Sequence, residues 1–218
     1  MNKSPLEIIL DLAPPLVEEA TPFIDKENGL KNVTAGSVLG SKVVIDTLNY
    51  FSKDARPLSV KVLVFNSPAS LRFHKGEIKK LPTAQTLQQW WEEDGSWFLG
   101  RASNLEAVFS NQWTGHSVAI TSQVIDDTNE PKRLLVDLSL PMIKDTEHNI
   151  EGLVSVVGVV NDDFLNGKMP VAFQTSTCLV VYAADNKDKE FKQVSWWKQS
   201  SPVTGKVIRK VREVLGGD

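Results

Sequence analysis

Strand patterns dominate the chain from about residue 42, and two runs alternate apolar and polar residues with the period of two that a half-buried strand produces. The clearest runs are 117–125, in which Val118, Ile120 and Val124 share one side, and 133–140, in which Val136 and three leucines do. Their link, 126–132, is short and polar. Since a parallel connection needs about a dozen residues or more, this spacing predicts an antiparallel hairpin.

Other runs are also predicted to form strands. Residues 58–65 are rich in β-branched side chains and are bounded by prolines, and 153–160 are apolar on both sides, which predicts a central strand. The remaining predicted strands are 42–51, 171–183 and 193–197, with a turn at 185–188 between the last two.

Three segments have helix signals instead. Ser4, Pro5 and Glu7 fit a capping box, with Pro14-Pro15 expected to stop that helix. Residues 84–94 follow Thr83 as N-cap, and 203–215 carry one apolar stripe between Thr204 as cap and Gly216 as stop. Residues 16–40 mix prolines, glycines and acids and are predicted to be irregular.

Together these elements predict a mainly β (α+β) fold, an antiparallel β-sandwich or jelly-roll-like domain with N-terminal, middle and C-terminal helices. Residues 1–40 form an N-terminal helix and irregular arm, and 41–200 the sandwich-like domain. Residues 201–218 form an amphipathic helix packed on the same domain. The short, non-helical links between strands disfavour alternating strand-helix folds.

Composition is that of a soluble globular protein, with 218 residues, 41% hydrophobic and 23% charged. No apolar run approaches the roughly 18–20 residues of a membrane span, and the N-terminus does not read as a secretory signal. Cys178 is the only cysteine, which excludes an internal disulfide and multi-cysteine metal sites, and its apolar surroundings predict burial. We therefore expect a reduced, cytoplasmic location.

Catalytic and metal-binding patterns were not found in the sequence. His74, His116 and His148 lack any spacing that puts two imidazoles on one metal, and His116 is interpreted as an incidental histidine before a strand. No GxSxG elbow is present, the glycines at 36 and 40 lack phosphate-loop order, and the acidic pairs fit no calcium loop. The sequence thus predicts neither enzyme nor cofactor nor metal.

Tryptophan is enriched and clustered. In a strand, neighbouring rings point to opposite faces, and in a helix they lie about 100° apart, so one ring of each pair is expected at a border or an interface. Core lids are the first interpretation, and a subunit or partner contact is the functional one. The candidate interface residues are Trp90, Trp91, Trp97, Trp113, Trp196 and Trp197.

The net charge of −3 is unevenly distributed. Residues 187–218 hold eight Lys or Arg and four Asp or Glu, so this tail carries +4 and the rest −7. The first interpretation of this positive charge is a solvated helix face. The alternative is single-stranded nucleic-acid binding through Lys206, Arg209, Lys210 and Arg212, with tryptophans stacking on bases. A carbohydrate-binding module with tryptophans along a groove is a further alternative.

In style, residues 42–200 resemble the single-jelly-roll proteins of viruses, which are β-rich, cysteine-poor and without enzyme motifs. The resemblance implies a viral or phage structural protein. With the missing catalytic motifs and the clustered tryptophans, it leads to one functional hypothesis. We expect a non-enzymatic structural or interaction protein that acts through self-association or partner binding.

Overall fold

The computed structural model describes residues 3–21, 29–66, 97–99, 115–124, 130–143, 153–175, 178–193, 195–198 and 201–216. The predicted middle helix at 84–94 lies outside these residues. Three long helices are present, and their bounds are α1 (Pro5–Ala20), α2 (Gly29–Tyr50) and α8 (Pro202–Leu215). Short helical turns are α6 (Asp162–Leu165), α7 (Ser195–Lys198), η1 (Leu140–Met142) and η2 (Glu190–Gln193).

The strands form one antiparallel sheet. In chain order they are β1 (Ala55–Asn66), β2 (Trp97–Leu99), β3 (His116–Val124), β4 (Pro131–Asp137), β5 (Val156–Val159), β6 (Val171–Gln174) and β7 (Cys178–Ala184). Their spatial order is β5-β4-β3-β1-β7-β6, and β2 pairs with β1 beyond the end of β3. The long strand β1 is therefore the centre of the sheet, pairing with β3 and β2 along one edge and with β7 along the other.

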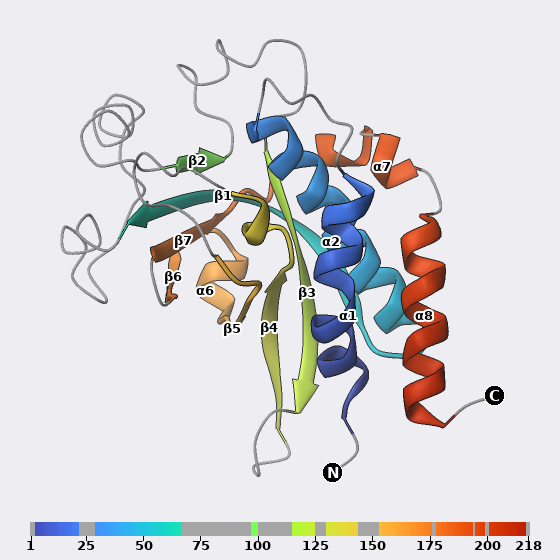
Figure 1. Ribbon diagram of the computed structural model, residues 1–218. Coiled ribbons are helices and arrows are strands. Elements are labelled where there is room, and N and C mark those ends of the chain that lie inside the picture. The colour runs from blue at the N-terminus through green and yellow to red at the C-terminus, as the bar shows by residue number, and fades with distance from the viewer. Residues whose placement is uncertain are drawn as a thin grey trace.

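This sheet curls until its two ends approach each other. Strands β4 and β7 are separated by two others, about 14 Å in a flat sheet, yet the Tyr182 hydroxyl reaches the Asp137 carboxylate across the interior. At the end strands, Phe173 of β6 packs directly on Gly158 of β5. The fold is thus a mixed α/β architecture with a nearly closed, barrel-like sheet (Figure 1). The described residues form a single sheet and do not confirm a sandwich or jelly roll.

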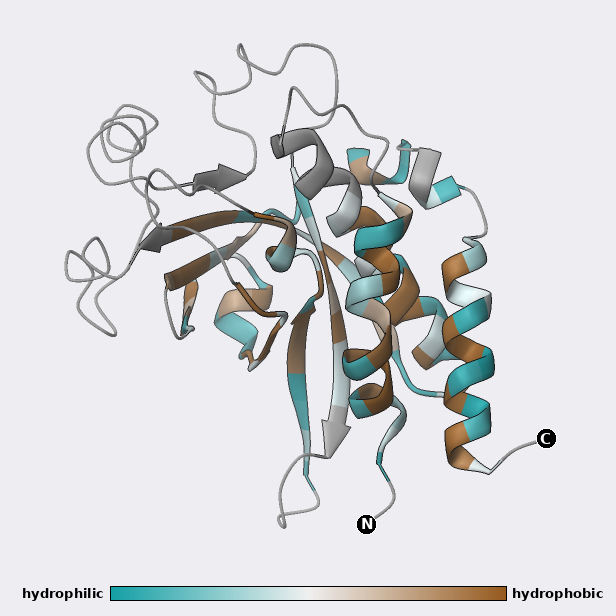
Figure 2. Cartoon of the chain, in the orientation of Figure 1, coloured by the Kyte–Doolittle hydropathy of each residue, from teal (hydrophilic) through white to brown (hydrophobic). Residues whose placement is uncertain are grey.

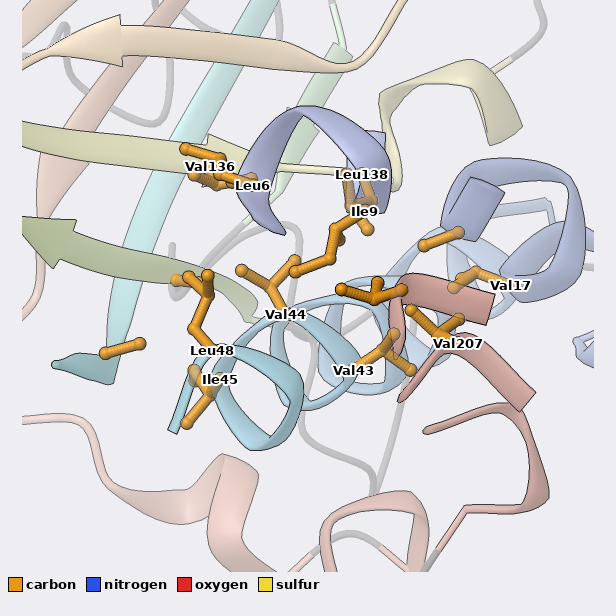
Figure 3. Close-up of a cluster of buried hydrophobic side chains, with 14 of the residues drawn as sticks. Leu6, Ile9, Val17, Val43, Val44, Ile45, Leu48, Val136, Leu138 and Val207 are labelled. Carbon is orange, nitrogen blue, oxygen red and sulfur yellow. The ribbon is translucent and has the colours of Figure 1, made fainter. Parts of the chain in front are cut away.

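Two cores fill the two sides of the sheet. The inner core occupies the concave side and is built from alternate residues of β1, β3 and β7 with α6 and η1, as Val62, Val118 and Val180 illustrate. The helix-side core lies where α1, α2 and α8 cover the outer side (Figures 1 and 3). In Figure 2, α8 alternates hydrophobic and hydrophilic bands, as expected for a helix with one buried stripe.

The N-terminal helix begins as predicted but extends further. Ser4 Oγ accepts from the Glu7 backbone N–H, and the Glu7 carboxylate accepts from the Ser4 N–H, which completes the capping box. The prediction that Pro14-Pro15 ends the helix is wrong, because α1 runs through both to Ala20. The two prolines remove two helical hydrogen bonds, but the burial of Ala13 and Val17 against the other helices compensates for that loss.

The largest error of the sequence interpretation concerns α2. Residues 29–40 are not irregular, and 42–50 are not a strand, because one 22-residue helix runs from Gly29 to Tyr50. Residues 22–28 of the predicted irregular arm lie outside the described residues. Its buried positions Leu39, Val43, Val44 and Leu48 follow the three-to-four residue spacing of a helix. The β-branched run at 43–45 has strand propensity, but its packing in the helix-side core decides the conformation.

Several smaller predictions also change. Residues 193–197 are not a strand, since η2 and α7 occupy this region. Strand β5 covers only Val156–Val159 and lies at the end of the sheet, so it is not central. The run 171–183 divides into the β6–β7 hairpin. The turn at 185–188 is present, with the Asp188 N–H bonded to Asp185, but it leads into η2.

The strand at 58–65, the hairpin of 117–125 with 133–140 and the C-terminal helix are confirmed. Residues 58–65 lie within β1, and β3 and β4 form the predicted antiparallel hairpin. The C-terminal helix ends at Gly216 in the left-handed conformation, as predicted. Its N-cap is Ser201, whose hydroxyl accepts from the Val203 N–H, and Thr204 lies inside the helix and is buried.

Gly158 is needed where the two ends of the sheet meet. A Cβ at this position would lie 1.9 Å from Cε1 of Phe173. We therefore expect Gly158→Ala to lower the free energy of unfolding by about 1–3 kcal/mol, the usual cost of overpacking. Urea unfolding measures this cost, and Gly158→Ala is compared with Gly205→Ala, whose added Cβ meets nothing within 4 Å. Equal midpoints for the two variants would show that the ring moves freely and that this contact does not close the sheet.

Candidate functional site

A group of four polar side chains lies inside the curled sheet. We call His116, Asp137, Ser139 and Tyr182 the polar cluster. All four residues are buried, and the His116 side chain has 0% exposure. Buried polar groups are costly unless they are hydrogen-bonded, so such a cluster in an apolar interior is a defined feature of the fold.

Three strands position these side chains close together. His116 is the first residue of β3, Asp137 the last of β4, and Tyr182 lies within β7. Alternate residues of a strand share a face, so His116 and Asp137 point inward with Val118 and Leu135, which belong to the inner core. The β3–β4 register pairs Ala119 with Val136, and its continuation brings Ser139 opposite His116.

Helix α2 passes close behind the cluster. A Cβ on Gly36 would lie 2.2 Å from Sδ of Met142 and 3.8 Å from Cβ of Ser139. Ser37 accepts a hydrogen bond from the backbone N–H of Ser117, the residue after His116. Glycine and serine at these two positions therefore allow the backbone of α2 to approach the start of β3 and the end of β4.

Asp137 is the centre of the cluster and accepts four hydrogen bonds from its other three members. Its Oδ2 lies 2.6 Å from Nε2 of His116 and 2.9 Å from the Tyr182 hydroxyl. Its Oδ1 accepts from the backbone N–H of Ser139 at 2.9 Å and from the Ser139 hydroxyl at 2.7 Å. Four donors on two oxygens match the acceptor capacity of an ionised carboxylate.

The electrostatics agree with an ionised Asp137. Burial raises the pKa of its carboxyl group, but the charge that His116 carries when protonated, its hydrogen bond and the two bonds from Ser139 outweigh burial, so the pKa lies below the ordinary 3.8. Burial, followed by the charge and hydrogen bond of Asp137, raises the pKa of Tyr182 well above 10.0. The tyrosine therefore keeps its proton and donates a hydrogen bond to the carboxylate.

The hydrogen bonds also fix the form of His116. A carboxylate only accepts, so the ring nitrogen 2.6 Å from it carries a hydrogen, and in the neutral form of the ring the lone pair is therefore on Nδ1. Nδ1 is buried and has no hydrogen-bond partner within the part of the chain that the structure describes. An imidazole oriented by a carboxylate through one nitrogen, with the other nitrogen uncommitted, is the arrangement of a general base.

A second feature lies on the outer side of the sheet, at the end strand β5. Val157 and Val159 pair with Val136 and Leu134, so they point to the side that carries the helix-side core. Whereas Val136 and Leu134 are buried, Val157 is 39% and Val159 52% exposed. Val154 just before the strand is exposed as well. We call Val157 and Val159 the β5 valine face.

Only one of the six tryptophans that are candidate interface residues has a described side chain. Trp197 on α7 packs edge-on against Phe191, with ring centroids 4.9 Å apart, and Lys42 of α2 lies 5.4 Å from its ring centroid. It borders the helix-side core, in agreement with the interpretation of these rings as lids. Trp97 and Trp196 are described by their backbones alone, while Trp90, Trp91 and Trp113 lie outside the described residues.

The predicted basic residues lie together on α8. Lys206, Arg209, Lys210 and Arg212 are all exposed and lie outside the buried stripe that contains Val207 and Val211. Lys210 is 3.9 Å from Glu213, and Arg212 also has an interaction partner. The four side chains form the solvated face that the sequence predicts, and their role in binding stays untested.

The remaining sequence features are the single cysteine, possible metal sites, possible membrane spans and the other two histidines. Cys178 is fully buried in the inner core, as predicted. Among the described residues, no three His, Cys, Asp or Glu side chains gather as a metal site. No described helix has the length and apolar character needed to cross a membrane. His74 and His148 lie outside the described residues.

Comparison with known proteins adds no functional information, since no family model, no curated protein and no solved structure matches this chain. Function is therefore argued from the geometry alone.

Sequence interpretation missed the polar cluster. Treating His116 as incidental was reasonable, because its partner Asp137 is 21 residues away and no motif joins them. One signal was available. Asp137 and Ser139 are polar residues at the end of an otherwise apolar run that the structure buries completely, and a buried carboxylate must have donors nearby.

Proposed function

We propose that this protein works as an interaction protein that self-associates through β5. The observation that carries the proposal is the β5 valine face. Val157 and Val159 continue a sheet surface that is covered at β4, yet they lie uncovered on a strand whose outer edge pairs with no described strand. Exposed apolar end strands are sites of strand addition, and natural proteins usually protect them with charges, prolines or bulges.

A second copy of the chain is the occupant that this strand fits best. Residues 156–159, VVGV, contain no charge and no proline. Antiparallel pairing of two β5 strands about a twofold axis places apolar residues against apolar residues in both directions, so the contact is self-complementary. Each pair of strands would extend the sheet across the dimer and place the valines of the two copies side by side on one face, where they shield part of one another from water.

Lysines on the β5 valine face are expected to abolish this association. We expect light scattering at micromolar concentration to give a dimer for the wild type and a monomer for Val157→Lys/Val159→Lys, because the charges repel across the twofold axis. Val214→Lys is the matched control, since Val214 is 59% exposed on α8, and this variant is expected to remain dimeric. A monomeric wild type, or a lysine variant that still dimerises, contradicts the proposal.

The basic face of α8 supports single-stranded nucleic-acid binding as a second candidate. Lys206, Arg209 and Lys210 are exposed on adjacent turns, which is the minimum that a backbone contact requires. Binding of a labelled single strand that weakens with salt, and with each lysine or arginine removed, would support it. The carbohydrate-binding module remains a prediction that rests on tryptophan content.

A further inference from the structure

The polar cluster goes beyond the proposed self-association, because it lies inside the sheet and uses other residues. Hydrogen bonds to Asp137 satisfy the polar side-chain groups of the cluster, apart from one atom. Nδ1 of His116 is the buried ring nitrogen for which the described residues offer no partner. A purely structural histidine is usually bonded at both nitrogens when buried, so the uncommitted lone pair is the feature that needs a function.

We propose that His116 is a general base, positioned by Asp137, that removes a proton from water as the water attacks an uncharged acyl ester. Nδ1 takes the proton, and the water oxygen forms a bond to the acyl carbon. The ester C–O bond then breaks, and the leaving alkoxide takes the proton back from Nδ1. The products are a carboxylic acid and an alcohol, and His116 returns to its starting form.

The surroundings of the cluster select the substrate class. The inner core beside it is apolar, with Val60, Val62 and Val118 as neighbours on the same side of the sheet. Asp137 already places one negative charge there, so an anionic substrate would be repelled and poorly solvated. An ester with an uncharged acyl chain and an uncharged alcohol fits both constraints.

Ser139 is not the nucleophile in this arrangement. Its hydroxyl hydrogen is directed to Oδ1 of Asp137 at 2.7 Å, while its oxygen is 3.3 Å from Nε2, the nitrogen that carries a hydrogen. Its proton therefore has no path to the lone pair on Nδ1. Ser139 and Tyr182 are positioning residues, which hold the carboxylate that in turn orients the imidazole.

Chemical modification tests whether the base can be reached. Diethyl pyrocarbonate acylates unprotonated imidazole nitrogens, and mass spectrometry of digested peptides locates the product. We expect modification of His116 in the folded protein, because a working base must open to small molecules. His116 that reacts only after denaturation, while His74 and His148 react in the native protein, would make the cluster structural and overturn the proposal.

Kinetics with p-nitrophenyl esters of short, uncharged acyl chains test the chemistry. His116→Gln keeps an N–H donor for Asp137 but has no lone pair at the Nδ1 position. We expect it to lose about 10²–10⁴-fold in kcat/KM, the usual contribution of a general base, while its urea midpoint stays close to wild type. Asp163→Asn is the control, because it removes only an exposed ion pair with Lys168 outside the polar cluster, and it is expected to retain the kcat/KM of wild type.

Each outcome of these assays decides the matter. A wild type that hydrolyses every ester no faster than His116→Gln excludes the general-base role. If His116→Gln fails to fold, modification of the wild-type protein carries the test by itself. Dimerisation has a separate readout in light scattering, so the failure of either proposal leaves the other standing.

Discussion

Replacing Asp137 by asparagine is expected to lower the free energy of unfolding by about 2–6 kcal/mol, since two buried donors lose their acceptor and each such loss costs about 1–3 kcal/mol. The amide has the volume of the carboxylate, so no cavity forms. It nevertheless turns an N–H group toward either the donors of His116 and Tyr182 or those of Ser139. Such buried donors without acceptors are the reason for the expected loss.

Two control variants separate this effect from smaller ones. Tyr182→Phe removes one of the four hydrogen bonds to the charged Asp137 and is expected to cost about 1.5–3 kcal/mol. Asp163→Asn removes an exposed ion pair with Lys168 and is expected to cost at most about 1 kcal/mol. Urea unfolding at pH 7 compares the three. A loss for Asp137→Asn no larger than that for Tyr182→Phe would show that the carboxylate is not the centre of the cluster.

The same variant carries a pH signature. The folded-state pKa of Asp137 is lowered below 3.8, so its contribution to stability is present above that value and is lost as the pH falls through the lower folded-state pKa. Wild type should therefore lose stability below about pH 4 more steeply than Asp137→Asn. Tyr182 has the opposite sign, because its raised pKa makes a contribution that is present below pH 10.0 and is lost as the pH rises through the higher folded-state pKa.

The sequence predicted the parts of the fold that local patterns determine. The β3–β4 hairpin followed from two alternating runs and a short link, and α8 followed from its stripe and its terminal glycine. Both succeeded because each element has one apolar side that matches its own period. The capping box of α1 succeeded for the same local reason.

The remaining features depend on contacts between segments far apart in the chain. Val43, Val44 and Ile45 favour a strand by propensity, yet they lie in α2 because α1, α8 and the sheet bury them together. The sequence did not predict that one sheet curls on itself, because the two ends of the sheet meet through Phe173 and Gly158, which come from different strands. His116 and Asp137 could not be paired from spacing, because the strand register brings them together.

Truncating Leu48 to alanine is expected to have the other large effect, a loss of about 2–5 kcal/mol in the free energy of unfolding. Leu48 has 0% exposure and lies in the helix-side core with Val44 and Ile45 (Figure 3). Alanine removes three carbon atoms from a closely packed site and leaves a cavity. Since alanine is also the best helix former, the loss measures packing and not helix propensity.

Val214→Ala on α8 is the matched control, because Val214 is 59% exposed and the substitution is expected to change stability by no more than about 0.5 kcal/mol. Val43→Ala then distinguishes a helix from a strand at 42–51. In a strand, Val43 points away from Val44 and Leu48, whereas in α2 all three are buried together. Urea unfolding should therefore show a clear loss for both Val43→Ala and Leu48→Ala, and a loss confined to one of them would contradict the helix.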